Sequence, residues 1–429
     1  MDLKSKLLSE TNFKGSVFGS IPVEWEIKKI SELDESKNCV QTGPFGSLLH
    51  SHDYQEQGHP LILVQHVKKG KIIEDNLPKI SDSKYFTLSK FILKEGDIVF
   101  TRVGYVGDSA FIEKKYSGWL ISGQMLRVRL NNLNINNRFV SLLFTTKRFQ
   151  NISKSVVLGS TRDSINTQIL KDMPIIIPSK HEQDKIVSII HPLNKWIENV
   201  ENQNKILEKI IQSIFKSWFI DFEGQTEFVD SELGQIPKGW IVSTIPECFD
   251  ISPNYYLKKG IIAPYIGMAD IPVNSLRISD FTYREFTSGT KFTNGDTLLA
   301  RITPSLENGK TAYVDFLQDN QIGWGSTEFI VMRPKDPFPK EYGYCLSRTN
   351  EFRSHAILNM TGTSGRQRVP ESCFDNYNIV IPSKSLLDDF RKISSIIFKQ
   401  IKINGIELNI LTKIRDSLLP KLMSGEIRV

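Results

Sequence analysis

Two stretches of the chain carry apolar residues at the alternating spacing of four and three that is typical of a coiled-coil helix. The first seam contains Ile186, Ile190, Leu193, Ile197, Val200, Asn204, Leu207, Ile211, Ile214 and Trp218. A weaker seam runs in the same register from Phe390 to Leu422, with Ser394 and Arg415 at seam positions. The pattern predicts two long helices of some 40 residues, each spanning roughly 60 Å.

One asparagine occupies the middle of each seam, Asn204 in the first and Asn404 in the second. A buried asparagine at such a position lowers stability but fixes register and partner, so these two residues are candidates for setting how the helices pair. The alternative is that each faces solvent where the seam loosens. Pro192 and Gly405 predict a break or kink in each helix, and Pro420 is expected to end the second one.

The segments that precede the two helices are related to each other. FKGSVFGSIPVEW at 13–25 agrees at six positions with FVDSELGQIPKGW at 228–240, and MPIIIPSK, ending at Lys180, is answered by YNIVIPSK, ending at Lys384, 204 residues later (384 − 180). Between these anchors, EGDIVFTR and NGDTLLAR each read as a turn followed by a buried strand, and they end on Arg102 and Arg301. Arg129 and Arg333 also match, as do Arg162 and Arg366. The chain is therefore a repeat of one unit of roughly 200 residues.

This organisation predicts an α+β protein with two related domains separated by two long helices. We expect the first domain at 1–178, the first helix at 179–224, the second domain at 225–382, and the second helix with a C-terminal tail at 383–429.

Composition and charge narrow the class of protein. With 429 residues, 40% hydrophobic and 24% charged, the chain has ordinary globular composition. A net charge of +6 does not by itself predict nucleic-acid binding. The absence of a long apolar run or a signal sequence predicts a cytoplasmic protein without membrane association. Cys39, Cys248, Cys345 and Cys373 are widely spaced and are expected to be reduced thiols.

With GPFGS at 43–47, IIIPSKHEQDKI at 175–186 and FKSWFIDFEG at 215–224, the repeated motifs resemble the specificity (S) subunit of type I restriction-modification systems. The resemblance covers essentially the whole chain, although SLLPKLMSGEI replaces SWFIDFEG after the second helix. It implies a non-catalytic protein with two target recognition domains, each binding half of a bipartite double-stranded DNA site. It also implies that the coiled-coil helices are antiparallel and set the gap between half-sites, giving approximate internal two-fold symmetry.

The resemblance further implies assembly with two methyltransferase (M) subunits and, in the full complex, with restriction (R) subunits. S-adenosylmethionine, ATP and Mg²⁺ are then expected in those partners, and no cofactor is expected in this chain.

The residues themselves indicate no catalytic chemistry. No NPPY or DPPY motif for a flipped adenine occurs. NGKT at 308–311 ends like a phosphate-binding loop, but Pro304 stands where its first glycine belongs. His50, His52 and His59 have a spacing that fits no standard metal site. We therefore expect no catalytic residue and no metal.

Two polar loops are the leading candidates for DNA contact, because arginine, lysine, asparagine and glutamine bind base edges and phosphates. The candidates are Thr161, Arg162 and Asn166 in the first copy and Arg366, Gln367 and Arg368 in the second. The alternative for the arginines is a salt bridge within the domain. Arg102 and Arg301 are further candidates, with a structural ion pair as their alternative. Residues that differ between the copies, namely Tyr105 and Lys114 against Lys310, are expected to contribute to specificity.

Two other features remain open. The GPFGS loop could hold a phosphate with its amides and hydroxyls, while Phe45 within it is expected to fill the core. Trp218 and Phe219 end the first helix, where Phe219 either meets a partner subunit or covers the base of the adjoining domain.

Overall fold

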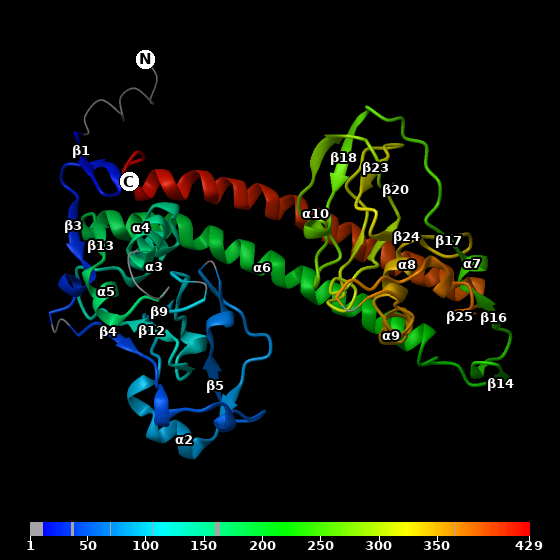
Figure 1. Ribbon diagram of the computed structural model, residues 1–429, viewed down its shortest axis with the longest axis horizontal. Coiled ribbons are helices and arrows are strands. Elements are labelled where there is room, and N and C mark those ends of the chain that lie inside the picture. Colours follow the sequence, from blue (N-terminus) through cyan, green and yellow to red (C-terminus); the bar gives the residue numbers. More distant parts are fainter. Residues whose placement is uncertain (1–11, 36–37, 69, 105, 159–163, 364) are drawn as a thin grey trace. The chain divides into compact units, whose positions relative to one another are not determined.

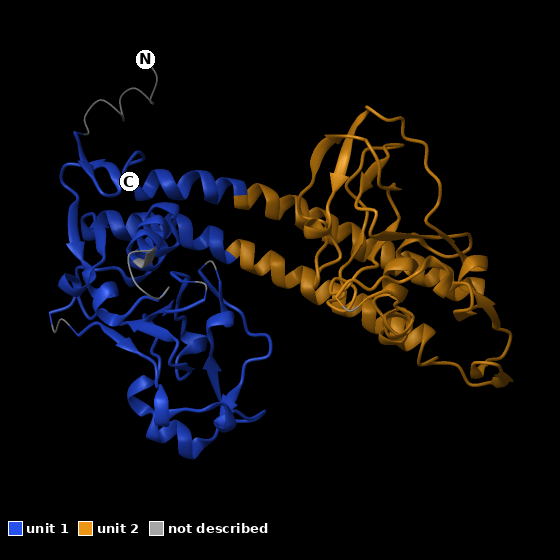
Figure 2. Ribbon diagram, viewed as in Figure 1, with its two compact units in different colours: residues 1–195, 413–429 blue, residues 196–412 orange. Residues whose placement is uncertain are grey.

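The computed structural model describes residues 12–35, 38–68, 70–104, 106–158, 164–363 and 365–429. It divides into two compact units, the first formed by residues 1–195 and 413–429 and the second by residues 196–412 (Figure 2). The units therefore do not follow the linear division expected from the sequence, because each includes part of both long helices.

The two predicted helices are confirmed as α6 (Lys180–Phe219) and α10 (Lys384–Met423), each of 40 residues (Figure 1). Both prolines lie inside helices, and the expectation that Pro420 ends the second one is wrong. Proline removes one backbone donor, but Pro420 is near the end of α10 and its carbonyl still accepts a hydrogen bond from the amide of Ser424 at 3.0 Å. The last turn therefore persists beyond the proline.

The two seam asparagines pair with each other inside the second unit. Asn404 Nδ2 donates to Asn204 Oδ1 at 2.8 Å, and Gln400 Nε2 donates to Asn404 Oδ1 at 2.8 Å. Asn404 is 2% exposed, so the alternative of a solvated asparagine is excluded for it. Phe215, later in α6, packs against Phe390, earlier in α10. The helices are therefore antiparallel in this unit.

Replacing Asn404 alone with leucine is expected to lower the free energy of unfolding by about 1–3 kcal/mol, because Asn204 loses its partner. The double variant N204L/N404L should recover that loss, since two leucines pack across a seam, but it should pair less specifically. Urea unfolding of the two single variants and the double variant measures the coupling. Additive losses would contradict a direct interaction.

The first unit is built on a four-stranded antiparallel sheet in the order β10-β9-β12-β4. A smaller sheet has the order β11-β5-β8, in which β11 and β5 are parallel. The strands of both sheets are β4 (Val40–Thr42), β5 (His59–Ile62), β8 (Lys79–Ile80), β9 (Ile98–Thr101), β10 (Ser109–Phe111), β11 (Leu120–Ile121) and β12 (Met125–Val128). The short helices are α2 (Asp82–Thr87), α3 (Asn137–Thr145), α4 (Lys147–Leu158) and α5 (Thr167–Asp172).

The second unit repeats this arrangement, with its main sheet in the order β22-β21-β24-β17 and a smaller sheet β19-β18-β23-β20. As with β11 and β5 in the first unit, two neighbouring strands of this smaller sheet, β18 and β23, are parallel. These strands are β17 (Phe249–Ile251), β18 (Ile262–Ile266), β19 (Thr282–Glu285), β20 (Thr290–Phe292), β21 (Thr297–Ala300), β22 (Thr311–Tyr313), β23 (Gly323–Gly325) and β24 (Phe329–Pro334). The helices are α7 (Ile245–Cys248), α8 (Lys340–Ser347) and α9 (Asn350–Leu358). The sequence repeat is thus a structural repeat.

The duplicated motifs form one substructure at the base of each unit. The strand after IPVEW, β3 (Glu26–Lys29), pairs with β13 (Pro174–Ile177), which leads into IPSK, and β16 (Ile241–Thr244) pairs likewise with β25 (Asn378–Ile381). Hairpins precede them, formed by β1 (Phe13–Ser16) with β2 (Gly19–Pro22) and by β14 (Phe228–Ser231) with β15 (Gly234–Pro237). Both motif tryptophans, Trp25 and Trp240, are buried. The motifs recur because they attach each sheet to its helix.

The matched arginines Arg129 and Arg333 each form an ion pair at the main sheet of their unit. Arg129 forms an ion pair with Asp97 at 2.6 Å, and Arg333 with Asp296 at 2.8 Å. The two aspartates are 1% and 0% exposed. Because a buried carboxylate requires a partner, this repeated arginine is explained by the fold.

In the part of the chain that the structure describes, no helix combines the length and the apolar character that a bilayer crossing requires. The four cysteines are free, and three of them are buried.

Candidate nucleic-acid interface

Three loops of the second unit meet at the end of β21. The amide of Arg301 donates to Glu328 O at 3.0 Å, and the amide of Val369 donates to Arg301 O at 2.8 Å. The amide of Thr303 also donates to Gln367 O at 3.1 Å. We call this meeting point the junction. It comprises Arg301 at the end of β21, the loop before β24 and the loop before β25.

The first unit contains the same junction. The amide of Arg102 donates to Gln124 O at 3.0 Å, and the amide of Ile165 donates to Arg102 O at 3.0 Å. Thus the repeat places Arg102 and Arg301 at equivalent points. The candidates Tyr105, Thr161 and Arg162 lie outside the described residues.

Acidic partners neutralise two of the three candidate arginines in the second unit. Arg368 forms a bidentate ion pair with Glu328, in which Nη2 donates to Oε1 at 2.7 Å and Nε donates to Oε2 at 2.9 Å. Arg301 donates to Val369 O at 3.0 Å and lies 3.6 Å from Glu371. Both arginines therefore adopt the intradomain pairing considered as the alternative.

Arg366 is exposed, and within the described part of the chain its guanidinium makes no ion pair. Gln367 lies beside it. Lys310, which directly precedes β22 at the same end of the sheet, donates from Nζ to Met268 O at 2.6 Å. The structure therefore gathers the candidates Arg301, Lys310, Arg366, Gln367 and Arg368 in one region.

Similarity to known proteins agrees with this geometry. A family model described as "Type I restriction modification DNA specificity domain" matches residues 22–209. The chain is 27% identical to the type I restriction enzyme MjaIX specificity subunit of Methanocaldococcus jannaschii, covering 98% of this chain and 97% of that protein. It is 23% identical to the HindI specificity subunit of Haemophilus influenzae, covering 79% and 88%.

Among solved structures, the S subunit of a type I restriction-modification system from M. genitalium superimposes with a TM-score of 0.57 at 16% identity, covering 98% of this chain and 99% of that one. The chain is therefore similar over nearly its whole length to specificity subunits of type I restriction enzymes, and residues 22–209 match the model of their DNA specificity domain.

The remaining candidates of the first unit lie farther apart from one another. The side-chain oxygen of Asn166 accepts a hydrogen bond from the amide of Ile169 at 2.8 Å and caps α5. Lys114 follows β10, whose residue Phe111 pairs with Ile98 at the start of β9. It therefore lies at the opposite end of the sheet from Arg102, and the structure does not bring it to the junction.

The end of α6 packs inside the second unit. Phe219 is 5% exposed and contacts Phe215, Tyr342 and Phe390, with ring centroids 5.1 Å apart in each case. A side chain this buried offers no surface to a partner, so that expectation is corrected and the alternative applies: Phe219 covers the base of the adjoining domain. Trp218 is half-buried and packs against Phe390.

Gln124 and Glu328 were not among the predicted site residues, and they stand at equivalent positions of the two junctions. Their backbone carbonyls accept from the repeated arginines, whereas their side chains differ. The offset of 204 residues that relates Arg129 to Arg333 also relates these two (328 − 124). This offset is the sequence signal by which Gln124 and Glu328 could have been recognised as equivalent.

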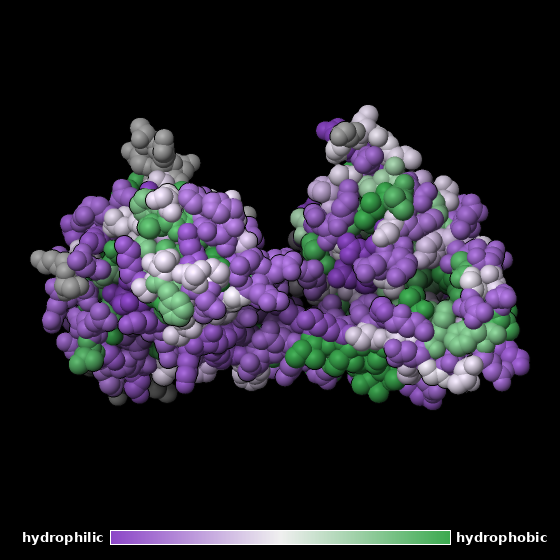
Figure 3. Space-filling model, turned by 90° about the horizontal axis from the view of Figure 1, so that it is seen from below, coloured by the Kyte–Doolittle hydropathy of each residue, from purple (hydrophilic) through white to green (hydrophobic). Residues whose placement is uncertain are grey.

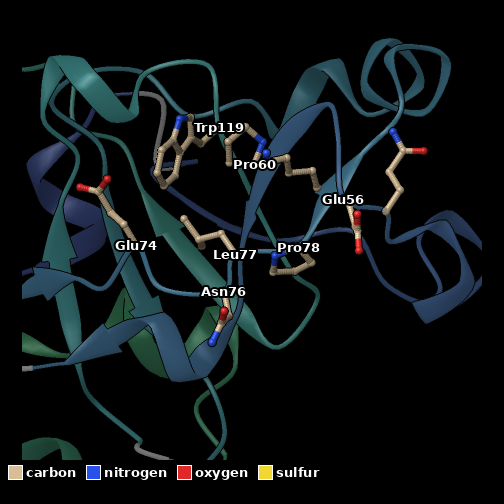
Figure 4. A pocket seen from close by; sticks show the side chains of 9 residues that line it. Glu56, Pro60, Glu74, Asn76, Leu77, Pro78 and Trp119 are labelled. Atoms are coloured by element: carbon tan, nitrogen blue, oxygen red, sulfur yellow. The ribbon is translucent and has the colours of Figure 1, made fainter. Parts of the chain in front are cut away.

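An open hollow of about 570 Å³ in the first unit is less suited to DNA. Glu56, Glu74, Leu77 and Trp119 are among its lining residues (Figure 4). Glu74 accepts hydrogen bonds from Lys115 Nζ at 2.8 Å and from the Tyr116 hydroxyl at 2.9 Å. Carboxylates repel phosphates, so we do not include this hollow in the interface.

Among the described residues, no three histidine, cysteine, aspartate or glutamate side chains gather closely enough to hold a metal ion. His50 stacks on His52, and His59 forms a contact of 2.8 Å with Asp82.

Proposed function

We propose that this chain is a specificity subunit that binds a bipartite double-stranded DNA site, with each unit recognising one half-site through its junction. The observation that carries the proposal is that one backbone arrangement is built twice with different side chains. A shared scaffold places two binding surfaces at equivalent points, and different side chains at those points favour different base sequences. Arg102, Arg301, Gln367, Arg368 and Lys310 remain candidate contacts, together with Arg366.

The paired helices are proposed to set the gap between the half-sites. Helices are stiff spacers with a rise of about 1.5 Å per residue, and the Asn204–Asn404 hydrogen bond fixes their register. Because the register is fixed, the length of the helix pair is fixed as well.

The partners are proposed to be two methyltransferase subunits and, in the full complex, restriction subunits. The helices carry exposed isoleucines, all between 43% and 70% exposed: Ile206 and Ile210 on α6, and Ile396, Ile403 and Ile410 on α10. Figure 3 shows an apolar strip along the lower edge of its view. Exposed apolar surface of this kind is typical of a protein interface, and we assign it to the methyltransferase subunits.

Catalysis is then proposed to depend on those partners, which would bring S-adenosylmethionine, ATP and Mg²⁺ to the DNA in the cytoplasm. This chain would select the DNA sequence, and the partner subunits would carry out the reactions.

Lengthening both helices tests the proposal. We expect four extra residues between Asn202 and Gln203, with four more between Glu407 and Leu408, to lengthen the spacer by about 6 Å. The gap should grow by about one or two base pairs, since base pairs are about 3.4 Å apart. Methylome sequencing of cells that carry the variant and its partner subunits measures both the gap and the half-sites.

A control variant replaces four residues at each place with the inserted sequence, which keeps the length and should keep the gap. Changed half-sites with an unchanged gap would show that the helices do not act as a spacer. Methylation without any bipartite sequence preference would overturn the proposed function as a whole.

A further inference from the structure

Each unit exposes an aromatic ring at an equivalent position of its fold. The chain leaves the edge strand of the main sheet, β4 or β17, and crosses to the smaller sheet, where a leucine holds it. Leu49 packs in the cluster of Leu61 and Leu120, and Leu257 in the cluster of Tyr265 and Trp324, and these are equivalent faces of the two smaller sheets.

Between the strand and the leucine lie Phe45, 60% exposed, and Tyr256, 83% exposed. Each is the fifth residue after an equivalent position of the edge strand, Val40 or Ile251 (45 − 40 and 256 − 251), since these two pair with Val128 and Met332. The expectation that Phe45 fills the core is wrong. An exposed ring is costly to keep in water, and its appearance in both units favours a contact with a ligand.

Close backbone packing holds Phe45 against the junction of the first unit. A Cβ atom on Gly43 would lie 2.1 Å from Ser122 O, and one on Gly123 would lie 2.6 Å from Phe45 Cβ. The amide of Gly43 donates to Met125 O at 3.0 Å. Only glycine fits at these two points, so the ring is presented from a fixed backbone beside Gln124.

A hollow of about 390 Å³ lies next to the ring. Its lining includes Phe45, Tyr54, Leu63, Gln65 and Gln124, and among the residues that the structure describes no lysine or arginine lines it. The two glutamines are exposed. An uncharged lining of amides and apolar groups suits a base edge rather than a phosphate.

The loop that carries Gln65 is also fixed. His66 is 2% exposed, and its Nδ1 accepts a hydrogen bond from the amide of Leu63 at 3.1 Å. Burial lowers the pKa of His66, which favours the neutral ring that can accept this bond. The glutamines Gln65 and Gln124 are therefore both carried by fixed backbone.

We propose that Phe45, Gln65 and Gln124 recognise an A·T base pair within the half-site of the first unit. An amide side chain such as that of Gln124 pairs with adenine N6 and N7 in the major groove, and an apolar group contacts the thymine methyl of the same pair. Gln65 also lines the hollow and offers a second amide for the neighbouring base edge. The inference rests on the proposed function, because it presupposes that this unit meets DNA.

The second unit supports this assignment by contrast. The position of Gln124 is taken there by Glu328, which holds Arg368 in a bidentate ion pair. Arginine favours guanine and glutamine favours adenine. The two units should therefore prefer different bases at equivalent points of their half-sites.

The test replaces each thymine of the first half-site in turn with uracil, which removes only the 5-methyl group. The DNA-binding complex of this chain with its methyltransferase subunits is titrated against each duplex by fluorescence anisotropy, for the natural chain and for Phe45→Ala. We expect the natural complex to lose about fourfold in affinity at one thymine, the factor for one buried methyl group. Phe45→Ala should bind the thymine and uracil duplexes equally at that position.

Phe86→Ala is the matched control, since Phe86 is 71% exposed on α2 and does not line the hollow. It should respond to uracil as the natural chain does. Gln124→Ala should lower the preference for adenine at the same base pair, and thermal unfolding should confirm that all variants are folded.

Two results would overturn the inference while leaving the proposed function intact. One is that Phe45→Ala responds to every uracil as the natural complex does, and the other is that the first half-site contains no A·T pair. Failure of the natural complex to prefer any sequence would instead refute the proposed function.

Discussion

Replacing Arg428 with methionine is expected to destabilise the first unit by about 3 kcal/mol, the cost of leaving a buried charge without its partner. Arg428 Nε lies 2.7 Å from Glu182 Oε1, and its Nη1 lies 2.7 Å from Glu24. Glu182 is 4% exposed and also accepts a hydrogen bond from the Trp25 indole at 2.9 Å. The C-terminal tail thus completes the IPVEW substructure at the other end of the sequence.

Hydrogen exchange followed by mass spectrometry measures this effect in the full chain. Peptides of β3 and β13 should lose protection in Arg428→Met, whereas peptides of β16 and β25 should not. Equal loss of protection in both units would contradict a local role for the tail.

The repeat supplies a rescue variant. Leu386 stands in the second unit where Glu182 stands in the first (386 − 182 = 204), and it packs there against the apolar core. The double variant E182L/R428M removes both charges, and replacing a buried ion pair with apolar residues is often neutral. It should therefore recover most of the stability that Arg428→Met loses.

Replacing Arg333 with methionine is expected to destabilise the second unit by about 3–5 kcal/mol. The carboxylate of Asp296 is fully buried and accepts from Arg333 Nε at 2.8 Å, from the Tyr255 hydroxyl at 2.9 Å and from the amide of Thr293 at 2.8 Å. Without Arg333 it keeps two neutral donors but no opposite charge. Urea unfolding monitored by hydrogen exchange in β21 and β24 measures the loss.

The effect of Arg333→Met should depend on pH. Burial raises the pKa of Asp296 above its ordinary value, despite the nearby Arg333. A carboxyl whose pKa is higher in the folded state stabilises the fold below its unfolded pKa, and this contribution is lost as pH rises through the folded pKa. Losing Arg333 raises that pKa further, so the variant should be closest to the natural chain in acid and most impaired at alkaline pH.

Lys392→Met provides the control for charge removal. Lys392 pairs with Asp389 at 2.8 Å on the surface of α10, and its side chain is 74% exposed. Exposed pairs of this kind contribute little, so this variant should unfold like the natural chain at every pH. A comparable loss in Lys392→Met would contradict burial as the cause.

The repeat allowed much of the architecture to be predicted, because motifs that attach a sheet to a helix must recur wherever that attachment recurs. The helices were predicted from their seams, since a period of 3.5 residues has only one regular structural solution. The pairing of Asn204 with Asn404 was one of two open alternatives. Only the antiparallel packing, in which position 204 meets position 404, decided between them.

The candidate site was predicted less completely. Arg301 and Arg366–Arg368 were each named as candidates, but that their loops meet at the end of β21 is a result of the fold. Lys114 was named for its difference between the copies, and sequence order does not reveal that it lies at the other end of its sheet from Arg102. Phe219 had two open alternatives and Phe45 was expected in the core, because an aromatic residue at a helix end or beside a glycine can face either way.

The sequence by itself determined that two related α+β units alternate with two seamed helices, since periodicity and duplication are properties of the chain alone. Only the tertiary structure decided that each unit is completed by a distant helix, that Arg129 and Arg333 neutralise buried aspartates, and that Phe45 stands exposed beside Gln124. The physical reason is that burial and charge pairing depend on distances between residues far apart in the chain, which local patterns do not contain.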